Sequence, residues 1–174
     1  AALIAARRKK KHVERQDFLD AVDRVIAGLE KKSKIITPLE KKRIAFHEAG
    51  HATVSWLLEH AHPLVKVTIV PRGQSLGAAW YLPEERSITT KEQILDEVKA
   101  ALGGRAAEEI IFGNISTGAL SDLEKVTKQV YGMIKVFGLN EKIGNVSFYD
   151  SSGQSEYTFK NPYSERLAQT IDEE

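Results

Sequence analysis

Six consecutive residues restrict the fold of this chain more than any other feature of its sequence. They read Phe46-His47-Glu48-Ala49-Gly50-His51, with the two histidines four positions apart. On an α-helix, residues i and i+4 lie on one face a turn apart, so both imidazoles can reach the same metal ion. Glu48 lies about 100° further round the helix than His47, where its carboxylate can take a proton from a metal-held water. The H-E-x-x-H spacing therefore predicts two zinc ligands and a general base on one helix.

The predicted helix has clear end signals. Thr37 can act as the N-cap, Pro38 fits the first helical position and Glu40 can close a capping box. Pro63 is expected to stop the helix at its other end. Gly50 costs a helix about 1 kcal/mol relative to alanine, so we expect another element to pack closely against the backbone between the two histidines. The apolar residues expected to be buried on one side of the helix are Leu39, Ile44, Val54, Leu57 and Leu58.

The motif could also arise by chance, with two ordinary histidines and a solvated glutamate, but the capped helix around it favours a metal site. The 174 residues include no cysteine, so any zinc site must use histidine and carboxylate ligands. A formal net charge of +1 gives no field that would attract nucleic acid. The basic run Arg7–His12 lies between two predicted helical segments without interleaved aromatic residues and is interpreted as a solvated turn.

Patterning along the rest of the chain predicts a mainly α-helical fold with a small β-sheet element. Thr89-Thr90-Lys91-Glu92 reads as a second capping box, and Gly103-Gly104 is expected to end the helix that it opens. Two strands, expected over residues 65–69 and 78–82, are joined by a short glycine-containing connection, which favours an antiparallel pair. One edge of this pair could accept an extended peptide, although a purely structural hairpin explains the pattern equally well. The polar segment Asp150–Lys160 is expected to be mobile. The strands are expected over residues 65–69, 78–82 and 146–149. The remaining helices are expected over residues 1–7, 18–26, 105–112, about 120–137 with Gly138 as C-cap, and after Asn161-Pro162.

A catalytic zinc site takes three protein ligands and leaves one position for water. Val54 and Leu57 stand where a metzincin would carry glycine and histidine, so that class is excluded. His60 lies about 180° round the helix from His51, and His62 falls beyond the helix end, so both are interpreted as surface histidines. The remaining candidates for the third ligand are the downstream carboxylates Glu92, Asp96, Glu97, Glu108, Glu109, Asp122 and Glu124.

Asp122 is notable among these carboxylates because it falls in the first turn of a predicted helix, after a glycine-containing loop. A short carboxylate can be held rigidly there as a ligand. It can equally serve only to complement the helix dipole, and spacing does not decide between the two roles.

From about Lys31 onward, the chain resembles the peptidase domain of the FtsH family of membrane-anchored, ATP-dependent zinc proteases, which includes the mitochondrial AAA proteases. Five stretches match that domain in the same order. Besides the zinc motif they are Lys66–Gly73, Leu82–Glu85, Leu102–Glu109, and Ser116–Ala119 followed by Asp122-Leu123. Residues 1–30 resemble the C-terminal tail of that family's ATPase lid. The resemblance implies a linker over 31–36 and a zinc peptidase domain over 37–174 whose C-terminal helices are truncated.

The resemblance also implies a role for each site residue. His47, His51 and Asp122 would bind one zinc ion, Glu48 would be the general base, and Glu108 would orient a ligand histidine or tune its basicity.

Many family members carry asparagine just before the ligand aspartate, whereas this chain has Ser121. Serine can also cap a helix, so we expect the ligand geometry to be kept.

The implied function is endopeptidase activity on unfolded or membrane proteins, in which Glu48 deprotonates a zinc-bound water and passes the proton to the leaving amine. The resemblance also implies a homo-hexamer for the full-length protein. No G-x-x-x-x-G-K-[ST] motif occurs, so ATP is expected to act only through an ATPase domain outside this chain, and membrane attachment only through segments outside it. The fragment itself is expected to be soluble, because it has no apolar run of the roughly 20 residues that span a bilayer.

The expected location of the full-length protein is the cytoplasmic face of a bacterial inner membrane, with a mitochondrial or plastid membrane as the alternative. Two other functions remain open. One is a protease-like domain without activity that serves oligomer assembly, and the other is a metal-dependent hydrolase of small amides.

Overall fold

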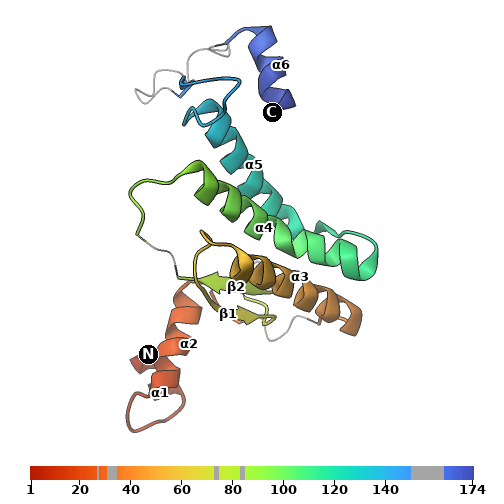
Figure 1. The fold of residues 1–174 in the computed structure, drawn as a ribbon. Helices are drawn as coiled ribbons and strands as arrows, with labels where there is room; N and C mark the ends of the chain where they lie inside the picture. Colours follow the sequence, from red (N-terminus) through yellow and green to blue (C-terminus); the bar gives the residue numbers. More distant parts are fainter. Residues whose placement is uncertain (27, 31–34, 73–74, 83–84, 150–162) are drawn as a thin grey trace.

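The computed structural model describes residues 1–26, 28–30, 35–72, 75–82, 85–149 and 163–174. Within these ranges the fold is mainly α-helical with one small antiparallel sheet, as the sequence predicts. Helices α3 (Pro38–Leu57) and α4 (Lys91–Phe112) pack side by side at its centre (Figure 1). Among the described helices, none combines the length and the apolar character needed to cross a bilayer.

Helix α3 begins where its sequence predicts. The Thr37 N–H donates to Glu40 Oε2 at 2.9 Å and the Glu40 N–H donates to Thr37 Oγ1 at 3.2 Å, which completes the capping box. The helix ends at Leu57, well before Pro63. The expectation that Pro63 stops it is therefore wrong, and the intervening loop is instead held on α4, where the His60 N–H donates to Asp96 Oδ2.

Helices α3 and α4 approach each other most closely at two glycines. A Cβ built on Gly50 would lie 2.3 Å from the carbonyl oxygen of Gly103, and one on Gly103 would lie 2.7 Å from that of Gly50. The close packing predicted from Gly50 is thus confirmed. The expectation that Gly103-Gly104 ends a helix is wrong, because these glycines lie inside α4, and the separate helix expected over 105–112 is its second half.

The N-terminus of α4 is capped one residue later than predicted. Thr90 is the N-cap, and its reciprocal partner is Gln93, in place of the Thr89 and Glu92 of the predicted box.

The face of α3 that turns inward is largely polar. Its buried residues are His47, Glu48, Gly50, His51 and Ser55. Leu39 is 65% exposed and Leu57 78% exposed, so the apolar face predicted for this helix is wrong at both positions. The side toward α4 and the sheet is taken up by the residues of the motif.

Strands β1 (Leu64–Thr68) and β2 (Ala78–Tyr81) form the predicted antiparallel pair, in which Thr68 lies opposite Ala78 and Leu64 opposite Tyr81. The sheet packs against α3 (Figure 1). On its other side it is tied to α2, because Asp23 forms ion pairs with Lys66 and Arg72.

Helices α1 (Ala2–Arg7) and α2 (Arg15–Ile26) pack against each other and are joined by the basic turn. Asp17 is fully buried between them and accepts hydrogen bonds from Arg8, Lys10 and the Glu14 N–H. The basic run is therefore partly neutralised by one buried carboxylate.

The C-terminal part contains a 3-10 turn (Thr117–Ala119), α5 (Leu120–Lys135) and α6 (Glu165–Glu173). The C-cap of α5 is Val136, and Gly138, expected in that role, lies two residues further on with a φ of +62°. The strand predicted over 146–149 is wrong, because within the described ranges this segment pairs with no strand, and its Phe148 N–H donates to the Lys135 carbonyl. The predictions of a mobile segment at 150–160 and of a helix start at 161–162 lie outside the described residues.

Candidate metal centre

Three side chains from α3 and α5 converge on one point. His47 Nε2 lies 3.1 Å from His51 Nε2 and 3.2 Å from Asp122 Oδ2. His51 Nε2 lies 3.4 Å from the same carboxylate oxygen. In the part of the chain that the structure describes, these residues form the one group of three whose donor atoms are close enough to hold a metal ion.

The spacing of the three donor atoms fits a tetrahedral ion. Ligand atoms at 2.0–2.1 Å from such an ion lie about 3.3 Å from one another, which matches the separations in this cluster. Two neutral imidazoles and one carboxylate are also a donor set that zinc accepts.

Gly104 of α4 leaves the space that an ion would need. A Cβ built on Gly104 would lie 2.6 Å from both His47 Nε2 and His51 Nε2. Any other residue at this position would place carbon against the two donor nitrogens. The second glycine of the pair therefore leaves room beside the candidate metal centre, whereas Gly103 allows the close helix packing.

Hydrogen bonds on the far sides of the rings set which imidazole nitrogens can bind a metal. His47 Nδ1 donates to Glu108 Oε1 at 2.8 Å, and His51 Nδ1 donates to the Ala100 carbonyl at 2.9 Å. With the proton on Nδ1, each Nε2 carries a free lone pair toward the cluster.

The charges around the cluster favour a cation. Burial raises the pKa of Asp122, but hydrogen bonds with His47 and His51 lower it much further, so the pKa lies far below the usual range of a carboxyl group. Burial lowers the pKa of His47, yet its hydrogen bonds to Asp122 and Glu108 raise it more, and the net pKa is above the ordinary value. Without a metal this environment attracts a proton, and with one it supplies negative charge to the ion.

Glu48 lies beside the cluster but outside its three converging donors. Its side chain packs against the hairpin, where a Cβ on Gly77 would lie 2.7 Å from Glu48 Oε1. Burial raises the pKa of Glu48, and the hydrogen bond from the Ala79 N–H and the nearby imidazoles only partly oppose this. A carboxylate with a raised pKa is better suited to accept a proton near neutral pH.

Several other carboxylates considered as third ligands are engaged elsewhere. Asp96 binds the His60 N–H and Lys99, Glu97 accepts from Gln129, and Glu124 pairs with Lys128. His62 lies 3.5 Å from Glu97. These groups are outside the cluster.

Asp122 is in the first turn of α5, as predicted, but not through a capping serine. The N-cap of α5 is Ala119, which makes no side-chain capping bond, and Ser121 is the second residue of the helix. The expectation that Ser121 caps α5 is therefore wrong. The turn before α5 is fixed instead by Ser116, whose Oγ accepts from the Gly118 N–H at 3.2 Å.

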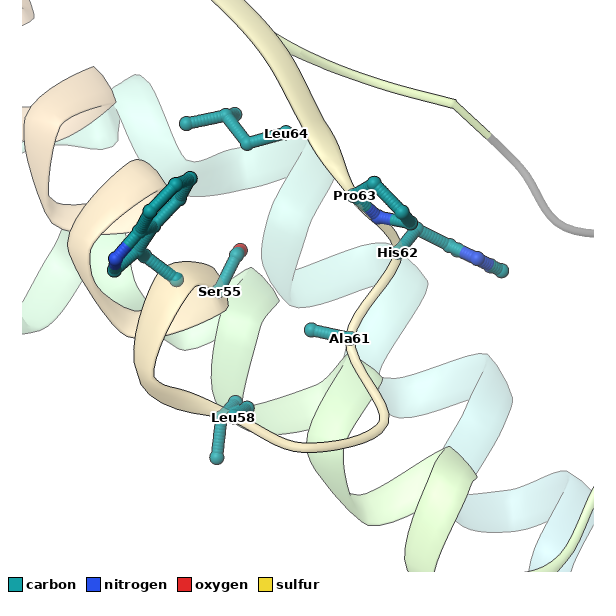
Figure 2. Close-up of a pocket in the computed structure, with 7 residues that line it drawn as sticks. Ser55, Leu58, Ala61, His62, Pro63 and Leu64 are labelled. Atoms are coloured by element: carbon teal, nitrogen blue, oxygen red, sulfur yellow. The ribbon is translucent and has the colours of Figure 1, made fainter.

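A shallow cavity beyond the C-terminal end of the motif is separate from the metal centre (Figure 2). It is connected to the motif through Ser55, whose hydroxyl lies 2.7 Å from the His51 carbonyl oxygen. None of the three converging residues lines it. Its lining residues are Ser55, Trp56, Leu58, Ala61, His62, Pro63 and Leu64.

Sequence reasoning missed Gly104, Gly77 and the Ala100 carbonyl as parts of this site. The only available signal was the pair of glycines within a helical pattern, which was interpreted as a helix end. Which atoms these residues face depends on how α4 and the hairpin pack on α3, and local patterning does not contain that information.

Comparison with known proteins gives a consistent result. The model of peptidase family M41 matches residues 34–174. An ATP-dependent zinc metalloprotease FtsH of Parabacteroides distasonis is 65% identical over 174 residues, which is 100% of this chain and 25% of that protein. The FtsH of Karelsulcia muelleri is 56% identical, over 100% of this chain and 28% of its own length.

A mouse relative, the mitochondrial inner membrane m-AAA protease component AFG3L2, is 53% identical over 100% of this chain and 22% of its own length. The chain therefore spans about a quarter of the length of the curated relatives that it matches.

Proposed function

Because the chain belongs to peptidase family M41, we propose that it is the zinc-dependent endopeptidase part of a larger ATP-dependent protease. The observation that carries the proposal is the convergence of His47, His51 and Asp122, with donor atoms 3.1–3.4 Å apart, around the space left by Gly104. These three residues would hold one zinc ion. The names of the relatives, which are zinc metalloproteases, support the same metal.

In the proposed reaction a bound zinc ion would supply Lewis acidity that lowers the pKa of a water and polarises the scissile carbonyl. Glu48 would take the proton of the attacking water and then give it to the leaving amine. Glu108 and the Ala100 carbonyl would keep both imidazoles in the tautomer that presents Nε2. Asp122 would remain ionised, because its folded-state pKa is strongly lowered.

The substrates that we propose are unfolded or membrane proteins, and the proposed assembly is a homo-hexamer of the full-length protein. ATP hydrolysis and membrane attachment would reside in the parts of the relatives that this chain does not span. We further propose the cytoplasmic face of a bacterial inner membrane as the location, since the two bacterial relatives share 65% and 56% identity with this chain and the mouse mitochondrial one 53%.

The test is zinc stoichiometry by elemental mass spectrometry on the purified chain and on its Asp122→Ala variant, followed by cleavage of an unfolded protein. We expect near one zinc per chain, sharply reduced in the variant. Little zinc in the parent after incubation with the metal would favour an inactive assembly domain. Full zinc in the variant would mean that another residue is the third ligand.

A further inference from the structure

Arg43 lies one helical turn before His47 on α3 and reaches across to the C-terminal end of α4. Its Nη1 donates to Glu108 Oε2 at 3.1 Å and to the Asn114 carbonyl at 3.3 Å. Its Nη2 donates to Asn114 Oδ1 at 2.7 Å, and the guanidinium lies 4.6 Å from the centre of the Phe112 ring. These contacts fix both the position of the guanidinium group and the orientation of its plane.

Glu108 stands between this arginine and the metal centre, with a different carboxylate oxygen toward each, and it is also hydrogen-bonded by the Ser116 side chain. Oε1 accepts from His47 Nδ1 at 2.8 Å, and Oε2 accepts from Arg43. The Glu108 side chain is 2% exposed. A carboxylate buried to this degree is costly unless it is paired and hydrogen-bonded, and Arg43 supplies a positively charged partner beside the hydrogen bonds from His47 and Ser116.

We propose that Arg43 is a positioning residue of the metal centre, which clamps Glu108 so that the carboxylate holds the His47 ring with Nε2 toward His51 and Asp122. The proposal rests on the proposed function, because it presumes that these three residues bind zinc. The hydrogen bonds of Arg43 go to Glu108 and Asn114, so its proposed effect on the three residues passes through Glu108. Nη1 contacts Glu108 and the Asn114 carbonyl, and Nη2 adds the contact with the Asn114 side chain. An ammonium group does not offer this planar arrangement of two nitrogens.

The alternative is that Arg43 merely fastens α3 to the end of α4 through Asn114 and Phe112. The two roles differ in which contact they need. Positioning requires the bond to Glu108, whereas fastening requires the bonds to Asn114. An Asn114→Ala variant removes a fastening contact and leaves the Glu108 contact, so it is the matched control.

The experiment measures the zinc affinity of the full 174-residue chain by competition with a chelator at fixed pH, in a double-mutant cycle of Arg43→Gln and Glu108→Gln. Loss of a partner that orients a ligand histidine typically weakens metal binding by about 10- to 100-fold. We expect Arg43→Gln to weaken zinc binding by about tenfold in the parent and to have almost no further effect in the Glu108→Gln background. Asn114→Ala should leave the affinity nearly unchanged.

Two results would overturn the proposal. The first is that Arg43→Gln weakens zinc binding equally in the parent and Glu108→Gln backgrounds, or weakens it in neither. The second is that Asn114→Ala weakens zinc binding as much as Arg43→Gln does. If Arg43→Gln does not fold, Arg43→Lys takes its place. We expect Arg43→Lys to weaken zinc binding by about threefold in the parent background only, which is less than the loss typical of complete removal of such a partner. The absorption spectrum of the Co²⁺-loaded chain should change in Arg43→Gln and not in Asn114→Ala. A parent chain that binds no zinc would instead refute the proposed function.

Discussion

Glu48 and Asp122 both lie beside the two histidines, but their surroundings suit them to different proposed roles. Asp122 converges with the imidazole nitrogens, whereas Glu48 packs against the hairpin outside that group. We therefore expect Glu48→Gln to keep one zinc per chain and to lose peptide hydrolysis by about 10²- to 10⁴-fold, the usual contribution of a general base. Zinc content and cleavage of an unfolded protein, measured on the same preparation, check both parts. Turnover close to that of the parent would exclude Glu48 as the base.

Gly104 yields a second prediction about a single residue. In Gly104→Ala a methyl group would lie 2.6 Å from both donor nitrogens, so we expect zinc binding to be lost. The metal-free chain should also lose stability, because the methyl group would clash with two buried imidazoles, and the gain of about 1 kcal/mol from the helix propensity of alanine does not offset contacts this short.

The matched control for Gly104→Ala is Gly132→Ala in α5, where the added carbon would meet only the Phe137 ring, at 3.3 Å. This control should bind zinc as the parent does. Zinc content and the metal-free melting temperature distinguish the outcomes, and normal zinc content in Gly104→Ala would contradict the assigned position of the ion.

The residues of the site could be predicted from sequence to unequal degrees. The motif histidines follow from i, i+4 spacing, because that relation is local. Spacing left Asp122 as one of seven carboxylates. Its place in a first helical turn did not decide between a ligand and a helix-dipole role, and the family resemblance made it a ligand, since its approach to the histidines depends on how α5 packs. The side chain of Arg43 reaches Glu108 and Asn114 across 65 and 71 residues, and no local pattern reveals such a contact.

Among the elements, the start of α3 was predicted correctly, the cap of α4 was predicted one residue too early, and α4 itself was divided wrongly. Capping depends on residues three positions apart, so Thr37 and Glu40 are sufficient to locate the start of α3. The glycines at 103 and 104 look like a helix end to local rules, but they are selected here by the close approach of α3 and by the donor nitrogens. Tertiary contacts thus overrode intrinsic propensity.

The pair of α1 and α2 should lose stability in acid through Asp17. The hydrogen bond from the Glu14 N–H, with Lys10 and Arg8, lowers the pKa of this carboxyl on folding. A lowered folded-state pKa means that the ionised carboxylate stabilises the fold above the unfolded pKa of about 3.9, and that this stabilisation is lost as the pH falls through the lower, folded value. Asp17→Asn should therefore be less stable than the parent at pH 7, with the difference shrinking below about pH 4.

Thermal unfolding of the parent and of Asp17→Asn, followed by far-ultraviolet circular dichroism between pH 7 and pH 2, checks this expectation. A stability difference that does not change with pH would show that the buried carboxylate acts through packing and not through its charge.

Across the whole molecule, the metal centre joins segments that are distant in sequence. His47 and Asp122 are separated by 75 residues, and α4 packs against both of the helices that carry them. The described parts also leave large apolar side chains at the surface, including Trp56 and Leu57, each 78% exposed. A bound ion would therefore add a cross-link to a fold whose apolar core is small.

Zinc should accordingly raise the melting temperature of the chain. A ligand that binds only the folded state stabilises it by about 4 kcal/mol at a free concentration 1,000 times its dissociation constant, and for a chain of this size that corresponds to an increase of about 8–16 °C. We expect this increase in the parent and in Glu48→Gln, and little of it in Asp122→Ala, because only the last variant lacks a converging donor. Calorimetric scans with zinc and with excess chelator measure it. An equal increase in Asp122→Ala would mean that the stabilising ion binds elsewhere, and α5 would then be held to α3 by side-chain packing alone.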